Sequence, residues 1–283
     1  MNKQRRLESL SLEFRQNRQA QFVAAFLILA FIVSIAVIFV DADPDAIDVK
    51  NKLQSFSSEH IFGTDEMGRD YFLRVLHGGR ISLLVGVMAM LCSVFIGVSL
   101  GTVAGYFGGT VDSILMRLVD VLSSIPWLIL VTIFSLLFRR GVGSLIIIIG
   151  LLSWMGIARL VRSEVLSLKE REYVQYAQFT GQNAAFIMFR HIIPAVFPTI
   201  ITAATSSIAS AIMMESALSF LGMGVAAPTS SWGSLLQSSQ KYLQKAPHMA
   251  FIPGVLIILT VYSFNKLGDV LRILLEPRVQ EER

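Results

Sequence analysis

Residues 81–107 read ISLLVGVMAMLCSVFIGVSLGTVAGYF and contain no charged side chain. An α-helix needs about 20 largely apolar residues to cross the hydrocarbon layer of a bilayer, so this run is long enough to span a membrane. The whole chain agrees with that interpretation, because its 283 residues are 54% hydrophobic and only 16% charged. A soluble domain has roughly 25% charged residues.

Five further uncharged runs predict five further spans. The first of them, at residues 20–40, is too long for the apolar core of a signal peptide, and no small-residue cleavage site follows it. The sequence therefore predicts an all-α integral membrane protein with six transmembrane helices in one transmembrane domain at 20–265. The five runs are residues 20–40, 121–138, 141–158, 192–214 and 249–265.

Glycines recur at every fourth position within the quoted run. Gly97, Gly101 and Gly105 share one helix face, and such a row lets two helices approach closely. The partner helix is either a sister subunit or another span of this chain, and the sequence leaves both open.

Basic residues in short loops mark the cytoplasmic side of a membrane protein. They occur in the N-terminal segment 1–19, in the loop 159–194 and in the tail 266–283, so we expect both termini in the cytoplasm; Arg139 and Arg140 are a local exception. Leu7, Leu10 and Phe14 predict that segment 1–19 is amphipathic and lies on the inner leaflet, with a loose basic tail as the alternative.

Two long segments are expected on the outer side. Residues 41–80 are mostly polar, and their acids do not match a calcium-binding loop. Residues 215–248 mix short apolar pieces with glycines and serines, which favours re-entrant or surface helices at the outer mouth of a pathway over a plain loop. Glu215, Phe220 and Trp232 are the candidate outer-gate residues, and Glu215 either pairs within this segment or faces the pathway.

The cytoplasmic loop 159–194 reads RLVRSEVLSLKEREYVQYAQFTGQNAAFIMFRHIIP. Apolar residues at helical spacing predict that the fourth span continues past the bilayer, to Ala177. Gly181 then ends the helix, since glycine takes a left-handed cap conformation readily. Asn183 starts a short helix that presents Phe186, and Pro194 opens the fifth span. The apolar face of the short helix fills a groove on a partner protein or rests on lipid.

Other function classes find little support. Cys92 is the only cysteine and the four histidines show no ligand spacing, so no metal site is expected. The basic residues form no block suited to nucleic acid. Asp120 is expected to pair with Arg117 on its own helix. An intramembrane enzyme would need a catalytic constellation, and a secondary transporter would show internal repeats and midplane acids; the sequence shows neither.

The loop 159–194 resembles the EAA loop of permease subunits of ATP-binding-cassette (ABC) importers. Ala177, Gly181 and Pro194 stand at the spacing of that motif, whereas Gln175 and Tyr176 replace its Glu and Ala, and His191 replaces its Ile. Longer stretches at 62–86, 109–126 and 215–236 resemble the peptide and nickel branch of the family. Across nearly its whole length the chain is most similar to the second permease of oligopeptide and dipeptide importers.

The resemblance implies a permease subunit in a bacterial cytoplasmic membrane, carrying peptides or, alternatively, nickel or a metal chelate. It implies a homologous second permease, two ATPase subunits and an external binding protein as partners. ATP and magnesium would bind to the ATPases, because this chain has no phosphate-binding loop, and no cofactor is expected here. The residues matching the ATPase-coupling segment are Ala177, Gly181, Gln182, Asn183, Phe186, Arg190 and Pro194.

Overall fold

The computed structural model describes residues 17–138 and 140–275. Those residues form helices and loops, with one isolated β-bridge between Thr64 and Asp70. The predicted amphipathic face of Leu7, Leu10 and Phe14, Arg139 and the end of the tail lie outside the described residues.

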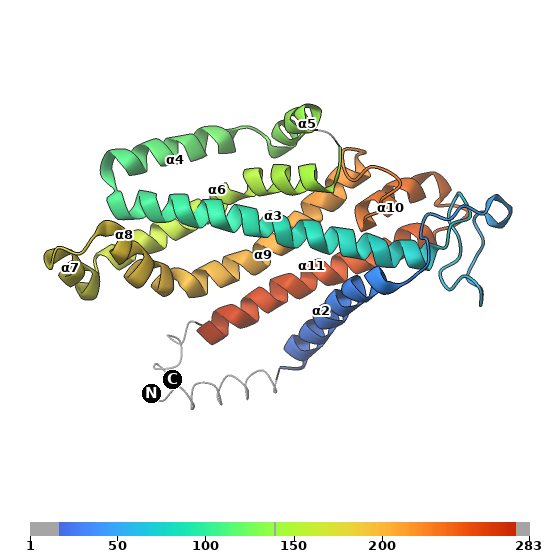
Figure 1. The fold of residues 1–283 in the computed structure, drawn as a ribbon, viewed down its shortest axis with the longest axis horizontal. Helices are drawn as coiled ribbons and strands as arrows, with labels where there is room; N and C mark the ends of the chain where they lie inside the picture. Colours follow the sequence, from blue (N-terminus) through green and yellow to red (C-terminus); the bar gives the residue numbers. More distant parts are fainter. Residues whose placement is uncertain (1–16, 139, 276–283) are drawn as a thin grey trace.

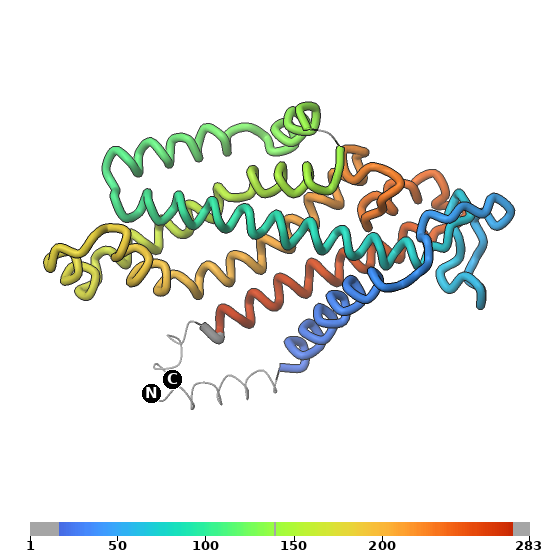
Figure 2. Tube along the Cα trace, viewed as in Figure 1, coloured from blue at the N-terminus to red at the C-terminus, as the bar shows by residue number. Residues whose placement is uncertain are grey.

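Within residues 17–138 and 140–275, five helices are long and apolar enough to cross a membrane. Their arrangement is lengthwise, with α3 through the middle of the molecule (Figures 1 and 2). They are α2 (Arg18–Ala36, continued by a 3-10 turn), α3 (Tyr71–Phe107), α6 (Val142–Lys169), α9 (Ile193–Phe220) and α11 (His248–Leu275).

The third predicted span is not one straight helix. Residues 109–137 form α4 (Gly109–Ser124) and α5 (Trp127–Leu137), which meet at 90°. Proline disfavours helical backbone in the residue before it, and Ile125, which precedes Pro126, is extended. The span predicted at 121–138 is therefore part of a bent pair that begins at Gly109, and the count of six spans holds when that pair is taken as one span.

The glycine row of α3 packs against α6 of the same chain, which decides between the two partners left open by the sequence. A Cβ added at Gly97 would lie 2.8 Å from Ile157 Cβ, and one at Gly101 would lie 2.6 Å from the carbonyl oxygen of Ala158. At Gly105 the nearest atom would be Val165 Cβ, at 2.8 Å. Only hydrogen at these positions permits the observed approach.

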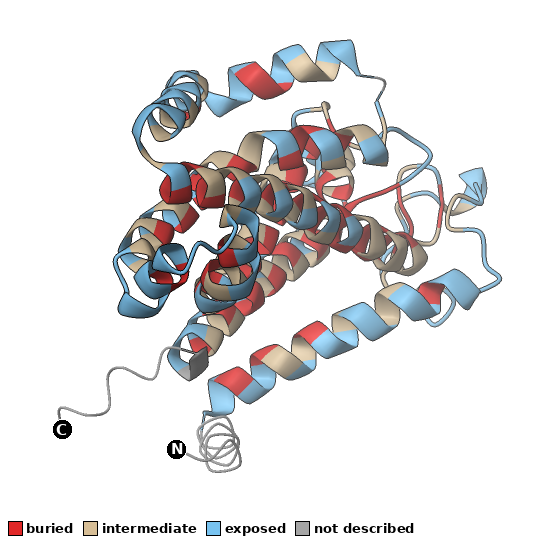
Figure 3. Ribbon diagram, turned by 60° about the vertical axis from the view of Figure 1, so that its left-hand side comes forward, coloured by how far each residue is buried: buried red, intermediate tan, exposed pale blue. Residues whose placement is uncertain are grey.

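Helices α2, α4 and α5 lie at the edges of the molecule. They carry mostly exposed residues, whereas buried residues concentrate on α3, α6 and α9 (Figure 3). Exposed apolar side chains include Phe22 of α2 and Leu136 of α5, which are 60% and 82% exposed. These surfaces suit lipid or another membrane subunit rather than water.

The spans connect two contrasting ends (Figure 1). At one end α7 (Glu172–Phe179) and α8 (Ala184–Ile187) form a compact loop, and α8 joins α9 through a π-helical turn (Met188–Ile192). At the other end lie the loop 41–70 and the short helix α10 (Trp232–Ser239). The polar loop is shorter than expected, because the Asp70 side chain accepts a hydrogen bond from the Leu73 amide and starts α3 at Tyr71.

Helix α6 ends earlier than predicted. It stops at Lys169, and Val174 and Ala177 belong to the separate helix α7. The turn between the two helices brings both residues into one buried cluster with Val161, Val165 and Ile187. Periodicity identified the right apolar residues, but their burial is achieved by a fold-back rather than by a longer helix.

Candidate functional site

The loop 159–194 is held in shape by a glycine turn. Gly181 has φ +76°, in the left-handed region that favours glycine. Its amide donates to the Gln178 carbonyl at 3.0 Å, and the Gln182 amide donates to the Ala177 carbonyl at 3.2 Å. This pair of bonds is the Schellman arrangement at a helix end, so the turn fixes the direction in which the chain leaves α7.

Helix α8 begins immediately after that turn. The Asn183 side chain accepts a hydrogen bond from the Ala185 amide at 3.1 Å, which caps the helix. Ile187 is completely buried, whereas Phe186 is 51% exposed. The short helix is thus anchored by one side chain and presents an aromatic ring on its outer face.

The exposed surface of the loop is aromatic. Phe179 is 95% exposed and Phe189 is 72% exposed, and with Phe186 they form what we call the aromatic tip. Gln182 and Arg190 are exposed near it, and Ala177 is buried, so Ala177 contributes packing rather than contact surface. Sequence reasoning missed Phe179, although an aromatic residue directly before a glycine turn was a visible signal.

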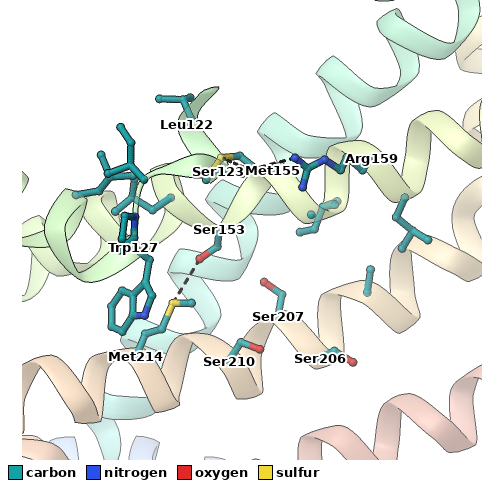
Figure 4. Close-up of a pocket in the computed structure, with 18 residues that line it drawn as sticks. Leu122, Ser123, Trp127, Ser153, Met155, Arg159, Ser206, Ser207, Ser210 and Met214 are labelled. Carbon is teal, nitrogen blue, oxygen red and sulfur yellow. Dashed lines mark hydrogen bonds between the residues drawn. The ribbon is translucent and has the colours of Figure 1, made fainter. Parts of the chain in front are cut away.

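A pocket of about 620 Å³ lies between the bent α4–α5 pair, α6 and α9 (Figure 4). Its wall is largely apolar, with serine hydroxyls and one arginine. We call it the serine pocket. The lining residues are Leu122, Ser123, Ile125, Pro126, Trp127, Leu130, Leu152, Ser153, Met155, Gly156, Ile157, Arg159, Leu160, Ala203, Ser206, Ser207, Ser210 and Met214.

The serines of α9 line one face of that helix, since positions three and four apart lie together. Ser207 is 3.2 Å from Ser93 of α3, oxygen to oxygen. Ser206 and Ser210 are exposed, and their hydroxyls have no hydrogen-bond partner among the described residues. On the facing wall Ser153 donates to the Met214 sulfur at 3.8 Å (Figure 4). The pocket thus offers free hydroxyls in a wall whose other side chains are mostly apolar.

Two ion pairs connect α4 to α6. Arg159 donates from Nη2 to Asp120 at 2.8 Å and to Ser123 at 3.3 Å. Arg162, one turn further along, contacts both oxygens of Asp112. The predicted pairing of Asp120 with Arg117 is therefore wrong, because the α4–α6 approach supplies a cation from a different helix.

Glu215 lies at the other end of α9, completely buried. Ser82 of α3 donates to its Oε2 at 2.9 Å, and Ser219 donates to its Oε1 at 2.7 Å. The Ser82 oxygen accepts from the Trp232 amide at 3.2 Å, and Ser231 donates to Ser219 at 3.4 Å. This network ties α3, α9 and the start of α10 together.

The three outer-gate candidates differ in how deeply the structure buries them. Trp232 is buried, its indole donates to the Val75 carbonyl at 3.0 Å, and a Cβ at Gly79 would lie 2.7 Å from its ring. Glu215 and Trp232 thus belong to one buried network, whereas Phe220 is 45% exposed. None of the three lines the serine pocket.

The loop 41–70 is fastened to α3 by charges that the sequence did not single out. Asp65 is buried and accepts from Arg69 Nε at 2.6 Å, and Arg74 lies 3.5 Å from Asp65 and 3.1 Å from Asp45. Buried charges of this kind are stable only when paired. The acids therefore hold the loop onto the helix end.

A family and several relatives match this chain. The family described as "Binding-protein-dependent transport system inner membrane component" matches residues 97–281, which is more than half of the chain and includes α6 to α11.

The relatives cover almost all of it. The oligopeptide transport system permease protein OppC of Bacillus subtilis (strain 168) is 35% identical over 271 residues, which are 95% of this chain and 89% of the relative. The dipeptide transport system permease protein DppC of the same organism is 40% identical over 263 residues, 91% of this chain and 82% of the relative.

The fold also has a solved counterpart. A chain from the inward-facing MetNI methionine ABC transporter superposes with a TM-score of 0.61 at 18% identity, covering 72% of this chain and 97% of that one. At that identity the likeness concerns the fold alone. The family match and the two relatives go further, and they establish that this chain belongs to the binding-protein-dependent transport system inner membrane components.

Proposed function

We propose that this chain is the transmembrane permease subunit of an ABC importer for peptides, forming half of the translocation pathway. One observation carries the proposal: relatives named as oligopeptide and dipeptide permeases align with more than nine tenths of the chain. The serine pocket is this chain's contribution to the passage, and a homologous second permease supplies the facing wall.

The aromatic tip is the proposed docking surface for an ATPase subunit. Phe179, Phe186 and Phe189 project from a short helix and turn whose buried side holds them in place, and such a face suits a groove on a partner. Gly181, Gln182, Asn183 and Arg190 surround the tip. ATP and magnesium bind to the ATPases, and this chain supplies the surface that receives their movement.

Docking of an ATPase at the aromatic tip also defines which end of the chain faces the cytoplasm. The loop 159–194 faces the cytoplasm, and α3, α6 and α11 all end on that side (Figure 1). Basic residues in this loop agree with that orientation. The loop 41–70 and α10 then face outward, where an external binding protein delivers the substrate.

Peptide fits the chemistry of the serine pocket better than a metal ion. Free hydroxyls such as those of Ser206 and Ser210 bond to peptide N–H and C=O groups whatever the side chains are. A bare metal ion would favour histidine, thiolate or carboxylate ligands, and the residues that line the pocket include none of these. A wall of hydroxyls and apolar side chains therefore suits cargo of varied sequence.

Uptake in a peptide-requiring auxotroph tests the proposal. A strain that lacks this chain is complemented with the wild-type chain or with an empty vector, and uptake of a labelled tripeptide and of nickel is measured in both. We expect tripeptide uptake to depend on the chain and nickel uptake to be independent of it. If tripeptide uptake is unchanged and nickel or metallophore uptake collapses without the chain, the peptide proposal is wrong.

A further inference from the structure

We propose that Arg159 is a specificity residue that binds the C-terminal carboxylate of a peptide in the serine pocket, exchanging it for Asp120. The inference rests on the proposed function and names the part of the substrate that the pocket recognises. A free peptide always ends in a carboxylate, and the guanidinium group matches the two oxygens of a carboxylate with two parallel N–H donors.

The position of Arg159 gives it access to that role. It is the one charged side chain among the eighteen described residues that line the pocket. It lies ten residues before the end of α6 at Lys169, which places it about 15 Å from that end at the helical rise per residue. Arg159 and the serines of α9 line the same pocket, so a peptide that lies along those serines can reach the guanidinium group.

The existing ion pair leaves Arg159 available. Only Nη2 is engaged, by Asp120 and Ser123, and Nε and Nη1 donate to no described residue. The side chains of Arg159 and Asp120 are 46% and 68% exposed. An ion pair as exposed as this contributes little stability, so opening it costs little.

The neighbouring pair provides the contrast. Arg162 uses two nitrogens on both oxygens of Asp112, and its side chain is 32% exposed, that of Asp112 16%. Arg162 does not line the pocket. Two arginines one turn apart therefore differ in geometry: one is locked to its helix partner, and the other keeps donors free beside a cavity.

Exchange also suits a passage. A substrate site in a channel must bind strongly enough to admit the cargo and weakly enough to release it. When a peptide carboxylate replaces Asp120, the arginine stays paired, and the released Asp120 carboxylate, whose side chain is 68% exposed, is solvated by water instead. Asp120 can then displace the peptide in turn.

The test uses the complete importer, with its second permease, ATPases and binding protein, in proteoliposomes. ATP-driven uptake is measured for a peptide and for its C-terminal amide, chosen so that the wild-type importer takes up both. The quantity of interest is the ratio of acid to amide uptake, compared between permease variants with the same binding protein. The preference of the binding protein then cancels from the comparison.

We expect Arg159→Gln to lower the acid-to-amide ratio about two- to fivefold, the range that corresponds to losing one partly exposed charge pair. The loss falls on the acid, and uptake of the amide stays near the wild-type rate. Arg159→Lys, which keeps the charge, retains part of the ratio. Asp120→Asn raises the ratio, because the competing carboxylate is gone. Arg162→Gln is the matched control and leaves the ratio at its wild-type value.

Two outcomes overturn the inference. An unchanged acid-to-amide ratio in Arg159→Gln removes the carboxylate contact. Equal losses of both peptide forms in Arg159→Gln and in Asp120→Asn show that the pair only fastens α4 to α6. Failure of the proposed function looks different, since the wild-type importer would then take up no peptide when ATP is supplied, and no acid–amide pair could be chosen.

Discussion

Gly181 is the residue whose backbone conformation decides where the aromatic tip points. Its φ of +76° costs an ordinary residue about 1–2 kcal/mol, and β-branched residues tolerate it least. A Cβ there would have no atom within 4 Å beyond its chain neighbours, so the cost of substitution comes chiefly from the backbone. The function of the turn can therefore be separated from the packing of the loop.

We predict that Gly181→Val abolishes transport while the protein still inserts and accumulates, because the turn reopens and the tip loses its angle. Gly181→Asn is the matched variant, since asparagine enters the left-handed region more easily, and it should retain much of the uptake. Gly143→Val controls for bulk at another open glycine site. Wild-type uptake with valine at Gly181, measured in vesicles, would show that the turn does not matter.

Glu215 is predicted to hold the outer end together. Replacing it with leucine removes the acceptor of both Ser82 and Ser219, and leaving buried hydroxyls unpaired costs about 1–3 kcal/mol. Glu215→Leu should lower the thermal stability of the detergent-solubilised protein and make residues 221–231 more sensitive to protease. Met213→Leu, at an exposed position on the same helix, should change neither. Equal stability of the two variants would mean that the serine network contributes nothing.

At the scale of single residues, the sequence predicts structure well where a conformation depends on interactions between neighbouring residues. The turn at Gly181 and the cap at Asn183 depend on a few neighbouring residues, so their signals are complete within the loop. Asp120 shows the limit. Helical periodicity reveals only partners on the same helix, and Arg159 reaches Asp120 from thirty-nine positions away in the chain.

At the scale of elements, the contact between α3 and α6 is the feature most sensitive to volume. The Cβ of any residue at Gly101 would lie 2.6 Å from a backbone oxygen of α6, and backbone cannot move aside as a side chain can. The row Gly97, Gly101 and Gly105 therefore sets the distance between the two helices.

We predict that Gly101→Leu separates α3 from α6. Overpacking typically lowers the free energy of unfolding by about 1–3 kcal/mol, and we expect this variant to lose at least that much. The expected result is a lower yield of folded protein and a lower unfolding temperature in detergent. Gly156→Leu is the control, because a Cβ at Gly156 on α6 meets no atom within 4 Å. Similar stability of both variants would contradict the close packing.

The bent pair α4–α5 shows why element boundaries were harder to predict. Composition marks residues 121–138 as apolar enough for a span, but composition does not state whether an apolar run crosses straight. Pro126 was the available signal. Its effect depends on whether neighbouring helices support a straight or a bent path, and those neighbours come from distant parts of the chain.

At the scale of the whole molecule, the chain is incomplete as a passage. The serine pocket is lined by residues of α4, α5, α6 and α9, and the edge helices expose large apolar residues such as Leu136 and Leu137. Apolar surface of this extent needs lipid or another membrane subunit to cover it.

We predict that the chain purified alone in mild detergent hydrolyses no ATP, and that affinity purification from its own host recovers a homologous permease and ATPase subunits with ATPase activity. Truncating the aromatic tip by Phe186→Ala and Phe189→Ala should release the ATPases while the second permease stays bound. Phe197→Ala is the control, at a similarly exposed position beyond the loop. Transport by a lone monomer would refute the assembly.

The overall architecture was accessible from sequence because apolar runs are long and the bilayer fixes their length. The pathway was not accessible, since the serine pocket combines residues from α4, α5, α6 and α9 and no single stretch of sequence contains its outline. The outer-gate candidates Glu215 and Trp232 were chosen for chemistry typical of function, and the fold uses both to fasten buried surfaces.

The buried cluster behind the loop has a mechanical consequence. It joins Tyr106 of α3, Val161 of α6, Val174 of α7, Ile187 of α8 and Val196 of α9 in one close-packed unit, and such interiors transmit strain rather than absorb it. A force applied to the aromatic tip should therefore move this unit as a rigid body. Helices α6 and α9 extend from the unit and form two walls of the pocket. We therefore expect these two walls to move together and to keep the spacing between Arg159 and the serines of α9. We expect the passage to open by rigid-body tilting of this unit relative to the second permease, with little rearrangement inside the unit itself.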